Sequence, residues 1–213
     1  MQEQVNSSFV FTIKDLILVL QFVAILYLLY RDRFLEWGRL RKIKKSGDAG
    51  EKAVSDALED LEDVFSVYHN LQGQLDQQRY EIDHLLLTHQ GVLLIETKNM
   101  RGTILARKES WVQIKASGSG KSYEREFRSP IQQIERTSRI FENLLASRGV
   151  RVRVQPVVVF SSPDTELRLK DQKFPVLVLS QVQEFVRTFS RDVPLTTRQL
   201  RKVKEILDEV YGF

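Results

Sequence analysis

The chain has 213 residues, of which 42% are hydrophobic and 28% charged, and this allows one folded domain with an additional segment. It contains no cysteine, which excludes disulfides, thiolate metal sites and a cysteine nucleophile. Its formal net charge is +4, from 32 Lys and Arg against 28 Asp and Glu.

This charge is unevenly distributed. Residues 31–45 carry seven basic and two acidic side chains, whereas residues 46–213 carry 24 of each and are neutral overall. Within the neutral part, residues 46–97 have a net charge of −9 and residues 98–153 a net charge of +8. An acidic stretch that can hold a cation is therefore followed by a basic one that can hold phosphates. The alternative is two solvated faces that neutralise each other.

An uncharged apolar run extends from Leu16 to Tyr30. As a helix it covers about 22 Å, less than the ~30 Å hydrocarbon core of a membrane, so flanking residues such as Lys14 must snorkel to extend it. The basic residues that follow predict that the C-terminal side is cytoplasmic. We therefore predict a single-pass anchor in a bacterial inner membrane, with lipid contacts through Leu16–Tyr30. The weaker alternatives are a cleaved signal peptide, which lacks a small-residue cleavage site here, and a buried helix or one that forms a homo-oligomer.

The remaining elements follow from periodicity and turn residues. Three segments are expected: an anchor with its basic juxtamembrane part (1–45), a domain core (46–165), and a C-terminal strand with helices that complete the domain (166–213). Helices are predicted at residues 48–62, 130–148, 181–189 and 196–211. Strands are predicted at residues 64–71, 81–88, 92–98, 103–106, 111–114, 154–160 and 175–179. Loops are predicted at residues 73–79 and 116–122. The order α-β-β-β-α-β predicts an α/β fold in which helices flank a mixed β-sheet, in addition to the N-terminal transmembrane helix.

Two acids and a lysine stand out on the predicted hairpin: Asp83, Glu96 and Lys98. If the hairpin closes through the two residues His89 and Gln90, positions whose numbers sum to 179 lie opposite each other. Asp83 and Glu96 would then face each other with Cβ atoms about 5 Å apart, and Lys98 would share their face.

Two opposed carboxylates in an apolar setting repel each other unless a cation or a proton lies between them. Mg²⁺ meets this need, because it accepts one or two carboxylates, keeps several waters and binds phosphate. The pattern therefore predicts a metal-dependent phosphodiester-cleaving site. The alternative is a strand that leaves the core for solvent at Glu96-Thr97-Lys98. The three histidines, His69, His84 and His89, are interpreted as isolated residues without a catalytic role.

The ordered motifs Gly50-Glu51, Ile82-Asp83-His84, Ile95-Glu96-Thr97-Lys98-Asn99 and Pro130-x-x-Gln133 make the chain similar to the nuclease-related domain (NERD) family of the PD-(D/E)xK nuclease superfamily. The similarity covers roughly residues 46–163. One departure is Ser129 before Pro130, where the family usually has Asn, but Ser also caps a helix.

The resemblance implies a restriction-endonuclease-like core and a nuclease (phosphodiester hydrolase) that depends on Mg²⁺ or Mn²⁺. It implies Asp83 and Glu96 as metal ligands, Lys98 as the catalytic lysine, Glu51 as a further acid and metal ligand, and Gln133 as the helix glutamine. From the sequence alone, Glu51 could instead complete a capping box that starts at Asp48. Gln133 lies on a partly apolar helix stripe, where its amide needs a partner.

The leading hypothesis is a membrane-anchored nuclease that hydrolyses DNA at the cytoplasmic face. Phosphates would be contacted by basic residues of the +8 stretch: Arg101, Arg107, Lys108, Lys121, Arg125 and Arg128. The first alternative is a catalytically inactive nuclease fold that binds nucleic acid or a protein partner at the membrane. The second is a membrane-tethered scaffold without nucleic-acid binding.

Overall fold

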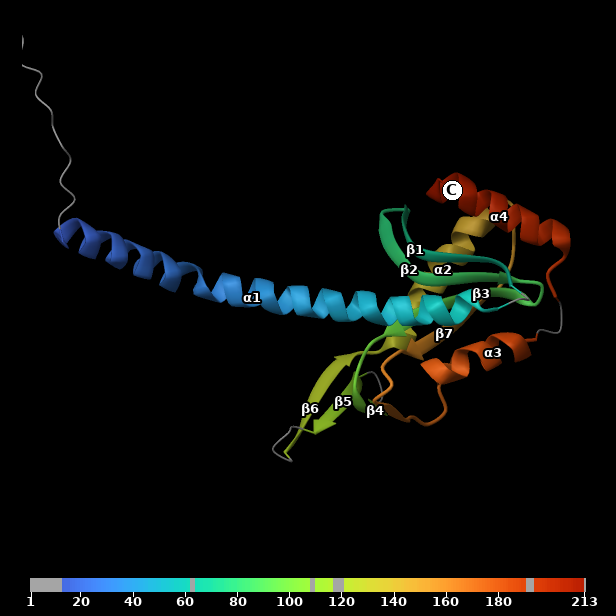
Figure 1. The fold of residues 1–213 in the computed structure, drawn as a ribbon. Coiled ribbons are helices and arrows are strands. Elements are labelled where there is room, and N and C mark those ends of the chain that lie inside the picture. The colour runs from blue at the N-terminus through green and yellow to red at the C-terminus, as the bar shows by residue number, and fades with distance from the viewer. Residues whose placement is uncertain (1–12, 62–63, 108–109, 117–120, 191–193, 213) are drawn as a thin grey trace, which may run out of the picture. The chain divides into compact units, whose positions relative to one another are not determined.

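The computed structural model describes residues 13–61, 64–107, 110–116, 121–190 and 194–212. The chain divides after Lys45 into two compact units, residues 1–45 and 46–213. A helix, α1 (Ile13–Glu59), begins in the first unit and ends in the second. All strands and the other helices belong to the second unit, which is shown with α1 in Figure 1.

A five-stranded sheet forms the centre of the second unit, with the strand order β1-β2-β3-β7-β9. The first three strands, β1 (Val64–Leu75), β2 (Gln78–Thr88) and β3 (Gly91–Lys98), are antiparallel neighbours. Strands β7 (Val154–Phe160) and β9 (Val176–Val178) add parallel to β3. The sheet is mixed, as predicted, and β3 is buried along almost its whole length because both of its faces pack into the core.

A second, four-stranded sheet has the order β6-β5-β4-β8. It consists of β4 (Gly102–Arg107), β5 (Ser110–Ala116), β6 (Ser122–Arg128) and β8 (Thr165–Arg168). In Figure 1, β5 and β6 project away from the five-stranded sheet, and β6 is the outer strand. Trp111 of β5 is buried and stacks on Phe160 of β7 with ring centroids 6.1 Å apart, so the core continues from one sheet to the other.

Helices cover both faces of the five-stranded sheet and divide the core into two clusters. One cluster joins the sheet to α2 (Pro130–Ser147) and α4 (Thr197–Tyr211). The other joins it to the end of α1 and to α3 (Val182–Thr188), which follows a short 3-10 turn, η1 (Leu179–Gln181). Along β2 and β3, neighbouring residues alternate between the clusters, as with Leu85 in the first and Leu86 in the second. This is the period-two pattern of strands buried on both faces.

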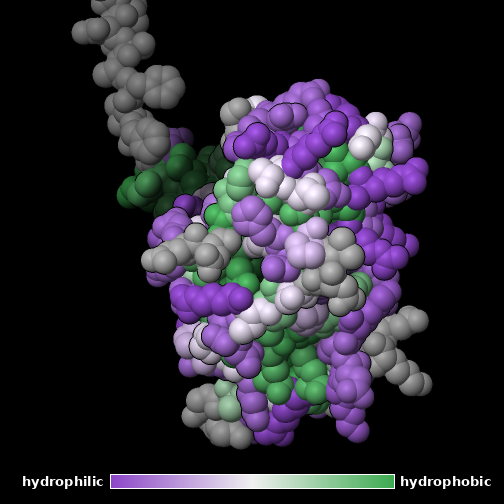
Figure 2. Space-filling model, turned by 90° about the vertical axis from the view of Figure 1, so that its right-hand side faces the viewer, coloured by the Kyte–Doolittle hydropathy of each residue, from purple (hydrophilic) through white to green (hydrophobic). Residues whose placement is uncertain are grey.

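Polar residues that begin α2 and α4 fix where these helices start. Ser129 Oγ accepts a hydrogen bond from Gln132 N at 3.4 Å, and Pro130 occupies the first helical turn, as predicted. Thr196 and Gln199 form a reciprocal capping box at α4. In Figure 2, hydrophilic side chains cover much of the visible face, and apolar side chains show between them.

Several predicted boundaries are wrong. The segment 73–79 is not a loop, because β1 and β2 continue to a two-residue turn at Asp76 and Gln77, both with positive φ (46° and 64°). Two-residue turns of this kind usually contain Asn-Gly or Asp-Gly, and Asp76-Gln77 lacks the glycine, so the sequence does not mark the turn clearly. Strands β6 and β8 were not predicted, because β6 is polar and exposed and β8 has only four residues.

The predicted transmembrane helix is not supported by the structure. Within the described residues, no helix combines the length and the apolar character needed to cross a membrane.

Candidate functional site

The hairpin of β2 and β3 has the predicted register. It closes through His89 and Gln90, with Thr88 opposite Gly91 and His84 opposite Ile95. Backbone pairing ends there, and the next contact is made by a side chain: Asp83 Oδ2 accepts a hydrogen bond from Thr97 N at 2.7 Å. The carboxylate of Asp83 is thus fixed against the backbone between Glu96 and Lys98.

Glu96 and Lys98 form an ion pair at the end of β3. Lys98 Nζ donates to Glu96 Oε1 at 2.5 Å, and Glu96 is only 5% exposed. Lys98 Nζ also donates to Gln133 Oε1 of α2 at 3.1 Å. Gln133 therefore has the hydrogen-bond partner that its position on the helix requires. Lys98 joins Glu96 and Gln133, and Asp83 is held to the same strand through Thr97 N, so four of the five predicted catalytic residues lie together.

The acids of this group are poorly solvated and repel one another. Burial raises the pKa of Glu96 from its ordinary 4.5 to about 7, and the neighbouring Asp83 carboxylate adds to the rise while Lys98 opposes it. Burial likewise raises the pKa of Asp83, although the Thr97 N–H lowers it. The site thus carries a negative charge that a cation would stabilise.

Glu51 joins the group through charge. Its pKa is raised first by burial and next by the charge of Asp83, so the two carboxylates are close enough to interact. The capping-box alternative is wrong, because α1 begins at Ile13 and runs through Asp48 and Glu51. Mid-helix, Glu51 has no free N-terminal N–H groups to satisfy.

Gly50 explains how α1 comes so close to the site. A Cβ atom at Gly50 would lie 2.6 Å from Asn99 Cβ and 2.6 Å from Ser161 Oγ. Only a glycine allows this approach, which brings the next residue, Glu51, beside Asp83. The Gly50-Glu51 motif is therefore explained by close packing of the helix on the ends of β3 and β7.

Two glycines of α1 give a matched test of this packing. Gly50→Ala is expected to lower the free energy of unfolding by about 1–3 kcal/mol, because the new methyl group overpacks the contact. Gly47→Ala should raise it by up to about 1 kcal/mol, because a Cβ there meets only Glu51 Oε1 at 4.0 Å and alanine favours helix. Urea denaturation of both variants measures the difference, and a shift of the same sign in both would contradict this packing.

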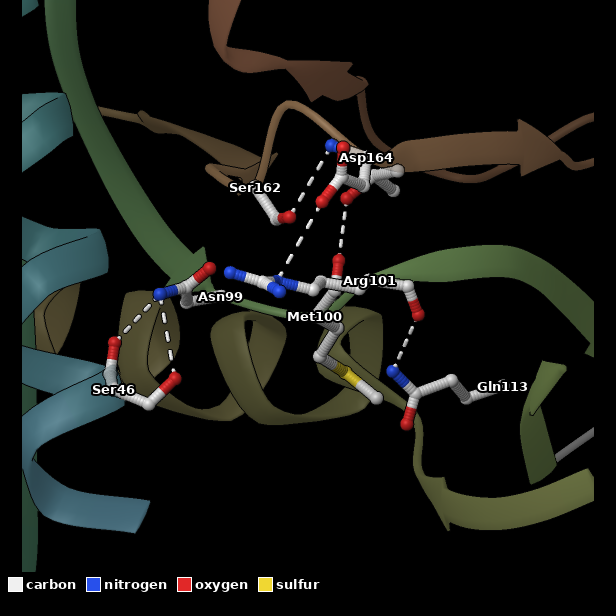
Figure 3. Close-up of polar contacts among 8 residues, drawn as sticks. Ser46, Asn99, Met100, Arg101, Gln113, Ser162 and Asp164 are labelled. Atoms are coloured by element: carbon white, nitrogen blue, oxygen red, sulfur yellow. Dashed lines mark hydrogen bonds and ion pairs between the residues drawn. The ribbon is translucent and has the colours of Figure 1, made fainter. Parts of the chain in front are cut away.

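The loop after Lys98 is held by contacts from three directions (Figure 3). Asn99 Nδ2 donates to Ser46 O at 2.7 Å, and Gln113 Nε2 donates to Arg101 O at 2.7 Å. The Arg101 side chain lies 3.6 Å from Asp164 Oδ2, between Nε and the carboxylate oxygen. These contacts fix the end of β3, and with it Lys98, to α1, β5 and the segment before β8.

The donor set fits Mg²⁺ better than a metal that prefers several side-chain ligands. No group of three or more His, Cys, Asp or Glu that could hold a metal ion is found in the described part of the chain. Mg²⁺ needs only one or two carboxylates and completes its shell with waters and phosphate oxygens. Among the described residues, Asp83 Oδ1 and Glu96 Oε2 make no hydrogen bond, so each acid retains an oxygen for a cation.

The predicted phosphate-binding residues are not gathered at the site. Arg101 is close to it in the chain, but is paired with Asp164. Arg125 and Arg128 are exposed on β6 and, being three positions apart, lie on opposite faces of that strand. Lys121 is exposed just before β6, and Arg107 ends β4. The side chain of Arg107 and the whole of Lys108 lie outside the described residues.

The interpretation of the histidines as isolated is wrong for two of them. His69 Nδ1 and His84 Nδ1 are 2.7 Å apart, and His69 Nε2 lies 3.3 Å from Ser55 Oγ of α1. Burial lowers the pKa of His84 to about 3, so this residue is neutral. The pair ties β1 and β2 to α1 rather than serving the acids. His69 and His84 lie opposite each other because β1 pairs with β2, and the sequence analysis did not predict that pairing.

Strand β3 carries buried Glu96 and, at its end, Lys98, and half-buried Asp83 of the neighbouring strand β2 accepts a hydrogen bond from the backbone between them. The sequence matches the family described as nuclease-related domain (NERD) over residues 46–161, which is more than half of the chain. The chain belongs to the NERD family.

Other comparisons add little. None of the curated proteins matches the sequence. Among solved structures, the fold is similar to that in the "Crystal structure of protein VC1899 from Vibrio cholerae", with 12% sequence identity and a TM-score of 0.34. The similarity covers 63% of this chain and 29% of that one, so this chain spans less than a third of that protein.

Proposed function

We propose that this NERD protein is a metal-dependent nuclease that hydrolyses phosphodiester bonds of DNA. The observation that carries the proposal is the pair of acids, half-buried Asp83 and buried Glu96, beside Lys98. Buried carboxylates with raised pKa values cost stability, and such an arrangement is retained where it serves a site. Family membership supports a nuclease-related role.

Each residue has a defined task in this proposal. Asp83 and Glu96 would hold Mg²⁺ or Mn²⁺, and Glu51 would add negative charge near Asp83. The bound metal would polarise the phosphate and lower the pKa of a water molecule. Lys98 Nζ can direct a hydrogen bond to the phosphoryl oxygen where negative charge develops. Gln133, which accepts from Lys98 at 3.1 Å, is a positioning residue for the lysine.

The alternative function is a nuclease-fold module that binds nucleic acid or a protein partner without turnover. The close ion pair between Lys98 and Glu96 favours this alternative, because the pair engages both the lysine and one carboxylate oxygen that hydrolysis would need. Cleavage assays separate the two functions. Full-length protein in detergent is incubated with single- and double-stranded DNA and with RNA, in Mg²⁺, in Mn²⁺ and in chelator. Metal-dependent products from the wild type but not from Glu96→Ala support hydrolysis, and binding without products in either metal supports the module.

A membrane anchor at residues 16–30 remains part of the proposal. In the described residues of this segment, large apolar side chains such as Leu18 and Phe22 are each 62% exposed. A contiguous exposed apolar surface of this kind needs lipid or a partner helix. The basic residues that follow would place the nuclease domain on the cytoplasmic face of the inner membrane.

Extraction from membranes tests the anchor. We expect the full chain to stay in the membrane pellet after carbonate treatment and to be released by detergent. Replacing Leu18, Phe22 and Leu26 with glutamine should move it to the supernatant, whereas the same exchange at exposed Leu40 should not. Release of the wild type by carbonate, together with a homo-oligomer in solution, would instead identify the segment as a self-associating helix.

A further inference from the structure

A groove lined by several polar side chains adjoins the candidate site. It has a volume of about 530 Å³ and lies between the β1–β2 hairpin and α2. Gln133 lines it, and Gln133 is also the residue that accepts from Lys98. Glu81 lines it as well, and its charge acts on Asp83 and Glu96. Gln133 and Glu81 therefore link the groove to the group of Asp83, Glu96 and Lys98.

Two arginines face each other across this groove. Arg79 comes from the start of β2 and Arg136 from α2, one turn after Gln133. Arg136 Nη1 lies 3.4 Å from the Arg79 carbonyl oxygen, to which it donates. Both side chains are exposed, and neither forms an ion pair with any carboxylate of the described residues. Arg101, Arg148 and Arg168, in contrast, are each paired with an acid.

The rest of the lining is suited to a sugar–phosphate chain. Gln72, Gln74 and Gln133 supply amides that both donate and accept hydrogen bonds. The Glu81 carboxylate in the groove accepts a hydrogen bond from Gln72 Nε2 at 3.0 Å, so part of its charge is already satisfied. The floor is Tyr80, whose ring lies so close to Gly73 that a Cβ there would be 2.3 Å from the Tyr80 hydroxyl.

We propose that this groove binds the phosphate backbone of the nucleic-acid strand that enters the site, with Arg79 and Arg136 as its phosphate-binding residues. The inference rests on the proposed function for the identity of the ligand. Guanidinium groups bind phosphate bidentately and amides bind sugar and phosphate oxygens, so the lining recognises the backbone rather than the bases.

The test measures binding without turnover. Full-length protein in detergent is titrated against a fluorescent single-stranded DNA 20-mer in chelator, at several salt concentrations. The variants are Arg79→Gln and Arg136→Gln, with Arg139→Gln as the matched control, because Arg139 is also exposed on α2 but does not line the groove. All are made a second time in a background in which five of the seven basic residues of the juxtamembrane segment are replaced by glutamine: Arg39, Arg41, Lys42, Lys44 and Lys45. Thermal melting verifies that the variants fold equally.

We expect each groove variant to bind about tenfold more weakly, and the slope of log affinity against log salt to fall by about one. Arg139→Gln should bind like its parent. Equal affinity of all three variants, or no binding by the parent in either background, would overturn the groove and leave hydrolysis at Asp83 and Glu96 standing. Selective loss of binding with no cleavage of any substrate would uphold the groove and refute the hydrolysis.

Discussion

Lys98→Ala should lower metal-dependent DNA cleavage by about 10²–10³-fold while metal binding is retained. In the proposed mechanism the lysine donates a hydrogen bond to the phosphoryl oxygen where charge develops, and loss of one such donor costs this much in rate. Asp83→Ala and Glu96→Ala should remove cleavage and metal binding together, because they remove the carboxylates proposed to hold the ion. Single-turnover cleavage and Mn²⁺ titration measure the two properties separately.

The controls for this prediction are Lys202→Ala and Glu205→Ala. These residues carry the same charges on the exposed surface of α4, where they pair with each other at 3.4 Å. Surface pairs of this kind contribute little to stability, so both variants should cleave like the wild type. Undiminished cleavage in Asp83→Ala, Glu96→Ala and Lys98→Ala would remove the catalytic role from this group of residues.

Glu96→Gln should stabilise the metal-free protein at pH 8 by about 3 kcal/mol, which corresponds to the rise in its pKa from 4.5 to about 7. Because the pKa of Glu96 is higher in the folded state, the folded protein binds its proton more tightly than the unfolded chain does. The stability linked to this group is therefore fully present below pH 4.5 and is lost as the pH rises through 7. The amide has no charge to lose, so the two proteins should differ at pH 8 and agree near pH 4.5.

Urea denaturation in chelator, followed by the fluorescence of buried Trp111, measures this effect. Saturating Mg²⁺ at pH 8 should stabilise the wild type, by about 2.7 kcal/mol at a hundred times the dissociation constant, and should have little effect on Glu96→Gln. Glu205→Gln is the control for loss of an exposed acid. The prediction would be falsified if wild type and Glu96→Gln showed the same pH dependence.

The hairpin is the part of the site that the sequence predicts best. The two-residue loop His89-Gln90 sets the register, because it places Thr88 opposite Gly91 and thereby fixes every pair that follows along β2 and β3. The end of the hairpin is different. There Asp83 bonds to Thr97 N instead of pairing in the ladder, and no local pattern gives this contact.

Contacts between residues far apart in the sequence could not be predicted from local patterns. Gln133 reaches Lys98 only because α2 packs on the sheet face that carries the site. The β1–β2 hairpin extends to Asp76 and Gln77, and this extension forms one wall of the groove with Arg79. The sequence shows that Arg136 follows Gln133 by one helical turn. It does not show that Arg79 lines the same groove.

By itself, the sequence determined the mixed α/β order, the hairpin register and the residue types of the site, because these depend on local periodicity and on side chains close in the chain. The tertiary structure decided which of those residues meet. Packing of α1 through Gly50 brings Glu51 to Asp83, and packing of α2 brings Gln133 to Lys98. It also decided that Arg79 and Arg136 line one groove together with Gln133, because strand pairing and helix packing join residues that are far apart in the sequence.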